Sequence, residues 1–432
     1  MLRAVAQPSL LPTPHDCAAV ARNRTRGWLF AALALVVAMH VASFSRPHVE
    51  GDEVVYQTLA QEMNWDFSHY TTMDHPRIRE FPSQAYRLPL YFHPPLFPYV
   101  LKLGGLLGQP VAVGLLFQLA AMVLLIYSLW RAALRQGVRD ASLAVLLLLT
   151  LTCPVLNFST ALLHIDGLMA AFLTSGILLF YESTEVSSVK LTVVSALLLA
   201  LALNTKFNSL IALPLVAFVQ LAHLWRARSA PENHGNAAWR CWKNWRLFMI
   251  LVAVLLPLGG WHYLRMLGTY GTLFPFSLRP SARTLNFSVY TRMVHERTRA
   301  QMFLHLILLI PATLALLSPW IWKGLRMGGR GKVFVALCVA CFAVLFLFTF
   351  GQDNLFRQER YYSAFLPFMY LTMVLLIDRL AAVPRERYLS WTVLSSGLML
   401  CTVFLNVVLG YKSSFIAPAL VDFLPFLDFL AS

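Results

Sequence analysis

The stretch that decides the fold is Pro110–Trp130, PVAVGLLFQLAAMVLLIYSLW, which contains no charged side chain. An α-helix rises 1.5 Å per residue, so a helix of this length extends about 30 Å, the thickness of the hydrocarbon core of a bilayer. This stretch therefore predicts a transmembrane helix.

The composition extends that prediction to the whole chain. Of its 432 residues, 58% are hydrophobic and 13% are charged, and the mean hydropathy is +0.63. A soluble domain of this size does not hide so much apolar surface. The net charge of +15 fits basic membrane loops and anionic lipid rather than nucleic acid. The six cysteines show neither a disulfide framework nor a zinc-binding spacing.

Ten further apolar segments approach or reach the length of roughly 17–25 residues that a transmembrane helix needs. They are residues 28–44, 141–158, 167–181, 190–205, 207–225, 247–264, 302–322, 333–350, 361–380 and 388–410. The sequence therefore predicts an all-α polytopic membrane protein with about eleven transmembrane helices.

Basic clusters between these segments set the orientation. The clusters that contain Arg131, Arg226, Lys323 and Arg379 all fall on the side of the basic N-terminus, provided that residues 94–107 do not cross the membrane. Basic loops stay in the cytoplasm. We therefore expect a cytoplasmic N-terminus, and a bacterial inner or plasma membrane as the location.

This topology divides the chain into three parts. Residues 1–27 form a cytoplasmic segment, residues 28–410 form the transmembrane domain, and residues 411–432 form a short external tail. The transmembrane domain includes a large first external loop, residues 45–109.

The first external loop carries Gly51-Asp52-Glu53 and, further on, Tyr91-Phe92-His93-Pro94-Pro95-Leu96. Adjacent carboxylates beside a membrane span are costly to hold near hydrocarbon, which makes them a candidate functional site. The alternative is that they only cap a juxtamembrane helix and meet the positive end of its dipole. The aromatic and proline residues of the loop indicate a folded cap on the membrane with juxtamembrane helices of its own.

Four further features are expected on the same external side. Asp166 lies where one span ends and the next begins, although a helix cap is the alternative explanation. Lys206 lies between two apolar segments, where a snorkelling anchor is the alternative. Trp261–Arg265 closes another span, and Arg360-Tyr361 opens the predicted span at 361–380. Together they predict carboxylates and cations around one external cleft.

Such a cleft suits the transfer of a sugar from a lipid-phosphate donor. A carboxylate takes the proton from an acceptor hydroxyl as the hydroxyl attacks the anomeric carbon. Cations stabilise the charge that builds up on the departing phosphate.

At these residues the chain resembles the GT-C superfamily of polytopic glycosyltransferases, in the branch of lipid A aminoarabinose transferases and protein O-mannosyltransferases. Gly51-Asp52-Glu53 with Tyr56 resembles the acidic motif of the family's first external loop, and His93-Pro94-Pro95-Leu96 resembles its Lys-Pro-Pro-Leu element. Asp166 is similar to the acidic position of its second loop. The later landmarks that the chain resembles are Lys206, Trp261–Gly271 and Arg360-Tyr361.

The resemblance implies a role for each of these residues. Asp52 is the implied general base of an inverting transfer, and Glu53 and Asp166 orient or assist it. The residues implied to contact the lipid phosphate are His93, Lys206, Arg265, Arg360 and Tyr361. His93 stands where the family has a lysine, so a phosphate contact there depends on the protonation of an imidazole.

The implied partners are a polyprenyl-phosphate-linked sugar donor, a glycan, lipid or protein acceptor, and membrane lipids. Mg²⁺ or Mn²⁺ is an open alternative as a cofactor, because both take the oxygen ligands that the acidic loop offers. Two other classes also stay open: a lipid or solute transporter or flippase, and a non-catalytic scaffold with a GT-C-like fold. Transporters usually carry ionisable residues midway along their spans, often in repeats, whereas the charged candidates here lie at span ends.

Overall fold

Helices form all the regular structure of the residues that the computed structural model describes, which are 14–45, 52–73, 75–79, 88–153, 156, 163–228, 234–271, 340 and 363–381. The predicted all-α membrane fold is confirmed, and the chain is an integral membrane protein. The predicted spans at 302–322 and 388–410, and all but residue 340 of the span at 333–350, lie outside the described residues.

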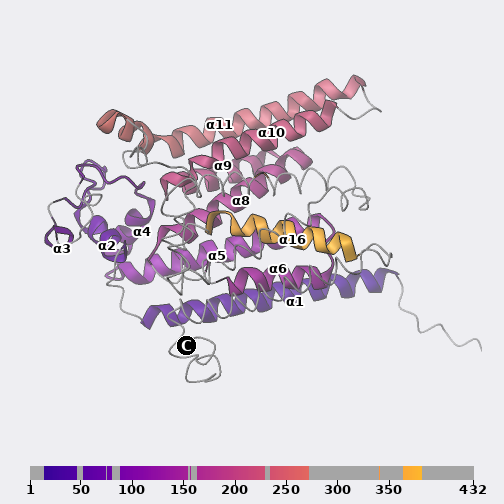
Figure 1. Ribbon diagram of the computed structural model, residues 1–432, viewed down its shortest axis with the longest axis horizontal. Helices are drawn as coiled ribbons and strands as arrows, with labels where there is room; N and C mark the ends of the chain where they lie inside the picture. Colours follow the sequence, from indigo (N-terminus) through magenta and orange to yellow (C-terminus); the bar gives the residue numbers. More distant parts are fainter. Residues whose placement is uncertain are drawn as a thin grey trace, which may run out of the picture.

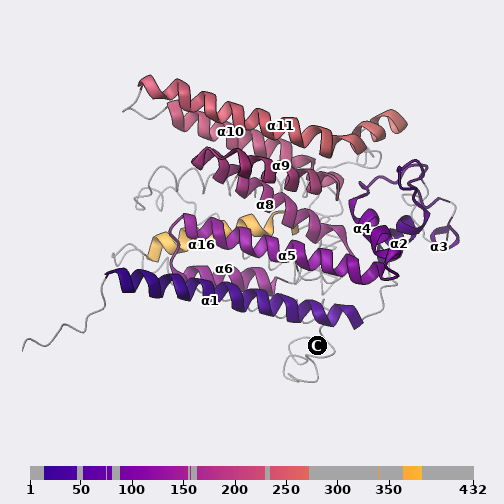
Figure 2. The same ribbon diagram turned by 180° about the vertical axis from the view of Figure 1, so that it is seen from behind.

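The long helices lie side by side as a bundle (Figures 1 and 2). They are α1 (Pro14–Val41), α5 (Pro110–Arg135), α6 (Asp140–Thr152), α8 (Ile165–Val186), α9 (Val189–Leu203), α10 (Ala212–Arg228), α11 (His234–Tyr270) and α16 (Leu366–Ala381). Four described segments are long and apolar enough to cross a membrane: Pro110–Arg135, Ile165–Val186, Phe207–Leu224 and Trp242–Tyr270.

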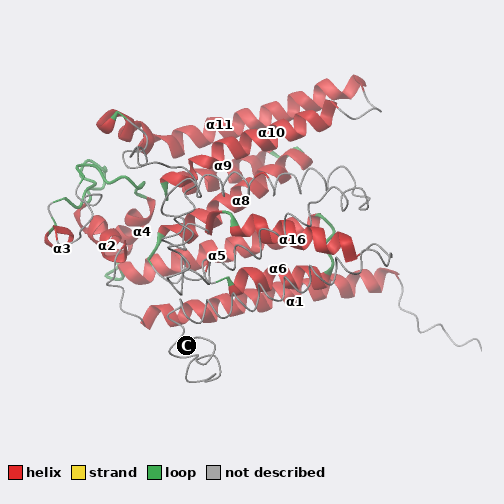
Figure 3. Ribbon diagram, in the orientation of Figure 1, coloured by secondary structure: helices red, strands yellow, loops and turns green. Residues whose placement is uncertain are grey.

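A cap of short helices covers one end of the bundle (Figure 3). It contains η1 (Ala42–Ser45), α2 (Asp52–Glu62), α3 (Pro76–Arg79) and α4 (Leu96–Leu106), while η3 (Phe207–Ile211) leads into α10. We call this end of the bundle the cap end. The segment 94–107 thus forms a short helix at the cap end, as the predicted juxtamembrane helix requires.

The opposite end, which we call the basic end, holds the turn from α5 to α6. Here Arg139 donates from Nε to the Asp378 carboxylate of α16 at 3.0 Å, and the Ser142 hydroxyl donates to the same oxygen at 2.8 Å. At the cap end, the Ser363 hydroxyl donates to the carbonyl of Asp166 at 3.2 Å. These bonds fasten the segment 363–381 to the bundle at both ends.

Helix α8 lies at the centre, since 94% of the residues in its most apolar stretch are buried. It approaches α9 closely at Gly176, where the Ser195 hydroxyl donates to the Gly176 carbonyl at 2.7 Å. A Cβ at Gly176 would lie 2.6 Å from the Leu199 side chain. Small residues permit such close approach of membrane helices, and here Gly176 lets the middle of α8, the helix that carries Asp166, pack against α9.

Candidate functional site

The acidic pair begins α2. Asp52 and Glu53 lie in the first turn of this helix, where carboxylates interact favourably with the helix dipole. Buried apolar residues behind them hold α2 against α4, and Tyr56 meets Phe97 edge to face with ring centroids 5.8 Å apart. The pair is therefore fixed on a packed helix and not on a free loop.

Glu53 makes a contact outside its own helix. Its side chain is 1% exposed, and its Oε1 accepts a hydrogen bond of 3.1 Å from the backbone N–H of Leu163. Leu163 directly precedes His164, the N-cap residue of α8. Glu53 thus ties the cap to the start of the central helix.

Asp52 also lies beside the start of α8, where its neighbour is His164, a residue that the sequence prediction missed. The Asp52 Oδ2 lies 3.7 Å from His164 Nδ1, and the Asp52 side chain is 15% exposed. The Gln118 amide on α5 donates to the backbone carbonyl of His164 at 2.7 Å, which fixes this turn. The only sequence signal for His164 is its position two residues before Asp166.

Asp166 and Lys206 form an ion pair in the protein interior, with side-chain exposures of 1% and 2%. Asp166 lies in the first turn of α8 and is not its N-cap, which is His164. Lys206 precedes η3 and points into the protein, so it is not a snorkelling anchor. The structure therefore contradicts both alternatives, a helix cap for Asp166 and a snorkelling anchor for Lys206.

His93 lies near this ion pair. Its ring stacks on Phe207, the residue after Lys206, with ring centroids 5.3 Å apart and planes at 13°. The backbone N–H of Leu96 donates to the Asn204 carbonyl at 2.9 Å. These contacts join the His93 loop to the Lys206 loop, so two of the predicted phosphate-binding cations lie in one neighbourhood.

A buried tyrosine supports the His93 loop from the cap. The Tyr70 hydroxyl donates to the Pro94 carbonyl over 3.4 Å. Burial raises the pKa of the Tyr70 phenol well above its usual value, because a low-dielectric environment disfavours the phenolate. The group therefore stays a neutral donor.

The Arg265 side chain binds backbone carbonyl groups of the cap. Its guanidinium donates to the carbonyl of Phe67 and, at 3.2 Å, to the carbonyl of Ser68. The Phe67 ring also packs on Trp261, with centroids 5.1 Å apart. In this structure Arg265 fastens the cap to α11, and its predicted contact with a phosphate stays a prediction.

Three predicted site features remain: Arg360, Tyr361 and a divalent metal ion. Arg360 and Tyr361 lie outside the described residues. Within the described ranges, no group of three or more His, Cys, Asp or Glu side chains is arranged to hold a metal ion. Mg²⁺ or Mn²⁺ as a cofactor therefore stays a prediction, and we assign a metal no step.

Comparison with known proteins shows that part of the chain matches a protein family. The model for dolichyl-phosphate-mannose-protein mannosyltransferases matches residues 92–238, a segment that includes His93, Asp166 and Lys206. The resemblance to GT-C glycosyltransferases is confirmed over this segment. A search of curated proteins found no significant match.

Solved structures also match the chain, two of which illustrate the similarity. One is the arabinofuranosyltransferase AftD from Mycobacteria, with a TM-score of 0.49 and 15% identity over 90% of this chain and 27% of that one. The other is the oligosaccharyltransferase AglB from Archaeoglobus fulgidus, solved with an inhibitory peptide and a dolichol-phosphate, with a TM-score of 0.47 and 13% identity over 90% of this chain and 56% of that one. The chain thus spans about a quarter of the first protein and just over half of the second.

Proposed function

We propose, from the family match of residues 92–238 and the acidic site at the cap end, that this chain is a membrane glycosyltransferase. It moves a sugar from a polyprenyl-phosphate donor to an acceptor hydroxyl, which belongs to a glycan, a lipid or a protein. The cap end faces the extracytoplasmic side, because the basic clusters at the opposite end stay in the cytoplasm.

One observation carries the choice of the base. Of the three carboxylates at the site, Glu53 and Asp166 are almost fully buried, whereas the Asp52 side chain is 15% exposed. A general base must come within hydrogen-bond reach of the proton that it takes. Asp52 is therefore the carboxylate that a substrate hydroxyl can reach, while Glu53 and Asp166 hold the surrounding segments.

The reaction is a single displacement with inversion at the anomeric carbon. Asp52 accepts the proton of the acceptor hydroxyl, while the oxygen of that hydroxyl forms a bond to the anomeric carbon. The bond from that carbon to the donor phosphate oxygen breaks, and its electron pair leaves with the lipid phosphate. His93 in its protonated form stabilises this anion, while Lys206, buried in its ion pair with Asp166, supports the adjoining His93 loop.

A transfer assay on the purified protein tests the proposal. The substrates are a set of polyprenyl-phosphate sugars together with a membrane extract as the source of acceptor. Asp52→Asn keeps the size of the side chain but removes the base, so the rate should fall by about two to four orders of magnitude. The matched control is Glu62→Gln, an exposed carboxylate at the other end of the same helix, and its rate should equal that of the wild type. Equal rates in all three proteins would refute the assignment of Asp52.

A further inference from the structure

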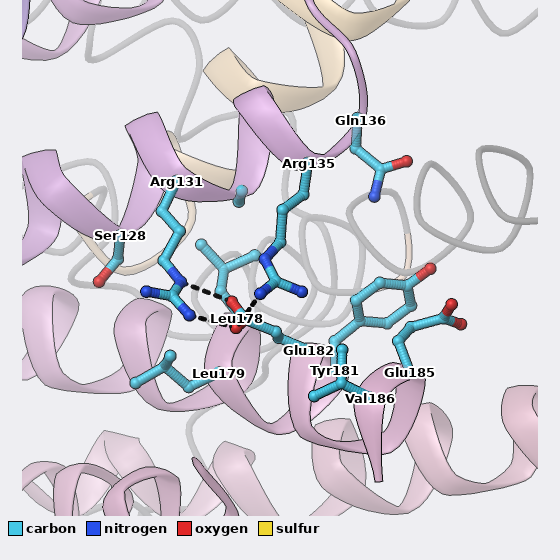
Figure 4. Close-up of a pocket in the computed structure, with 11 residues that line it drawn as sticks. Ser128, Arg131, Arg135, Gln136, Leu178, Leu179, Tyr181, Glu182, Glu185 and Val186 are labelled. Atoms are coloured by element: carbon cyan, nitrogen blue, oxygen red, sulfur yellow. Dashed lines mark hydrogen bonds and ion pairs between the residues drawn. The ribbon is translucent and has the colours of Figure 1, made fainter. Parts of the chain in front are cut away.

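A cavity of about 260 Å³ lies between α5 and α8 at the basic end (Figure 4). One of its walls includes Glu182, which lies about 24 Å along α8 from Asp166, at 1.5 Å per residue. The cavity is therefore separate from the candidate active site. Its volume is several times that of a water molecule, roughly 30 Å³, and suits a small polar group.

The α5 wall of the cavity is positively charged. Arg131 donates hydrogen bonds to the Glu182 carboxylate from two nitrogens, Nη2 and Nε, with Nε at 2.8 Å from Oε2. Arg135 contacts the same carboxylate from Nη2 at 2.7 Å. One carboxylate thus balances two guanidinium groups, which leaves one positive charge on this wall.

Arg135 is the arginine that offers this charge to a ligand. Its side chain is 42% exposed, whereas Glu182 beneath it is 6% exposed. A guanidinium carries five N–H donors, and the contact with Glu182 engages one nitrogen. The geometry of a guanidinium matches two oxygens of a phosphate.

The α8 wall supplies the opposite charge. Glu185 lines the cavity together with Tyr181, one turn earlier, and both side chains lie on the same side of it in Figure 4. The Glu185 carboxylate lies 3.6 Å from His223 Nδ1 on α10. A ligand with only a negative charge would be repelled by this carboxylate, and a ligand with only a positive charge would be repelled by Arg135. The two walls together fit a ligand that carries both charges.

The cavity lies where lipid headgroups are expected. It is formed by the last turns of α5 and α8, two of the segments long and apolar enough to span a membrane. Charged side chains at span ends reach the headgroup layer, and basic pockets between spans bind lipid headgroups there.

We propose that this cavity binds the headgroup of an aminophospholipid, a lipid with a phosphodiester and a primary ammonium group. The phosphodiester contacts Arg135, and the ammonium group contacts Glu185. The lipid is a bound structural partner at the end of the bundle remote from the acidic site, so the proposal does not depend on the enzymatic function.

Native mass spectrometry of the full chain tests this, after exchange into a mixture of phosphatidylethanolamine and phosphatidylglycerol with identical acyl chains. The wild type should retain phosphatidylethanolamine. Arg135→Ala should weaken this retention about tenfold or more, since hydrogen bonds to charged groups are the strong ones. Arg135→Lys keeps the charge and should retain part of the binding. Lys190→Ala removes an exposed cation at the start of α9 and should bind as the wild type does.

Two further measurements decide the chemistry and the source. Glu185→Gln should bind both lipids equally, because the group that selects the ammonium is gone. Soluble phosphoethanolamine at the concentration of the lipid should not displace it, because the acyl chains hold the lipid at the protein. Equal retention of both lipids by the wild type, full retention by Arg135→Ala, or displacement by soluble phosphoethanolamine would each overturn the proposal.

Discussion

Lys206 and Asp166 are paired inside the protein, one before η3 and the other in the first turn of α8, with both side chains almost fully buried. The Tyr263 hydroxyl of α11 donates to the backbone carbonyl of Lys206 over 3.3 Å. The ion pair therefore joins two parts of the central bundle directly below the cap.

This pair predicts a large loss of stability when one partner is removed. Lys206→Met leaves the Asp166 charge buried without its cation, which typically costs about 3–5 kcal/mol. The double variant Asp166→Leu with Lys206→Met should recover most of that loss, because an apolar pair of similar volume replaces the ions. Thermal unfolding of the detergent-purified proteins measures both effects. Lys190→Met, at an exposed lysine, is the control, and equal midpoints for it and Lys206→Met would contradict the prediction.

His164 predicts a loss of turnover without loss of the fold. The imidazole lies beside Asp52 and makes no side-chain cap bond to its own helix, so His164→Ala removes a neighbour of the proposed base. A misplaced catalytic group costs up to about a hundredfold in rate, and we expect kcat to fall about 10- to 100-fold while the KM for the donor stays the same. His69→Ala, at an exposed histidine of the cap, should match the wild type. A rise in KM with unchanged kcat would show that His164 binds substrate instead.

The apolar pattern predicted the helices of the bundle well, because hydrocarbon leaves a chain few alternatives to a helix. It predicted the boundaries less well where a helix is buried on all sides. The sequence suggested residues 167–181 for the span that the structure extends to Ile165–Val186. Its polar last turns are accommodated by internal bonds, such as the one of 2.7 Å between the Thr184 hydroxyl and His223 Nε2.

The contacts of the site could be predicted only in part. Asp52, Glu53, Asp166 and Lys206 stood out because charges are rare in this chain. Their partners did not stand out, because the backbone N–H of Leu163 carries no sequence signal. The pairing of Arg265 with carbonyl oxygens of the cap was equally hidden, since any residue type supplies a carbonyl.

Close packing of α8 on α9 predicts an effect at Gly176. A Cβ there would lie 2.6 Å from Leu199 Cδ2 and 3.3 Å from its backbone nitrogen, so Gly176→Ala forces the two helices apart. Such overpacking costs about 1–3 kcal/mol. Gly260→Ala is the matched control, because a Cβ at Gly260 meets nothing within 4 Å and alanine favours the helix. Thermal unfolding should place Gly176→Ala below the wild type and Gly260→Ala at or above it, and the reverse order would refute the packing argument.

Arg265 allows two roles to be separated, a clamp on the cap or a contact to the donor phosphate. If it is a clamp, Arg265→Gln loses charge-assisted bonds to Phe67 and Ser68, worth about 1.5–3 kcal/mol each. Local opening of the cap should then become at least tenfold more frequent, which hydrogen–deuterium exchange of the peptide covering residues 63–70 measures. Arg246→Gln changes an exposed arginine near the other end of the same helix and should leave this exchange unchanged. Unchanged exchange in Arg265→Gln, together with weaker donor binding, would contradict the clamp and favour the direct contact, because only the clamp acts through the carbonyls of the cap.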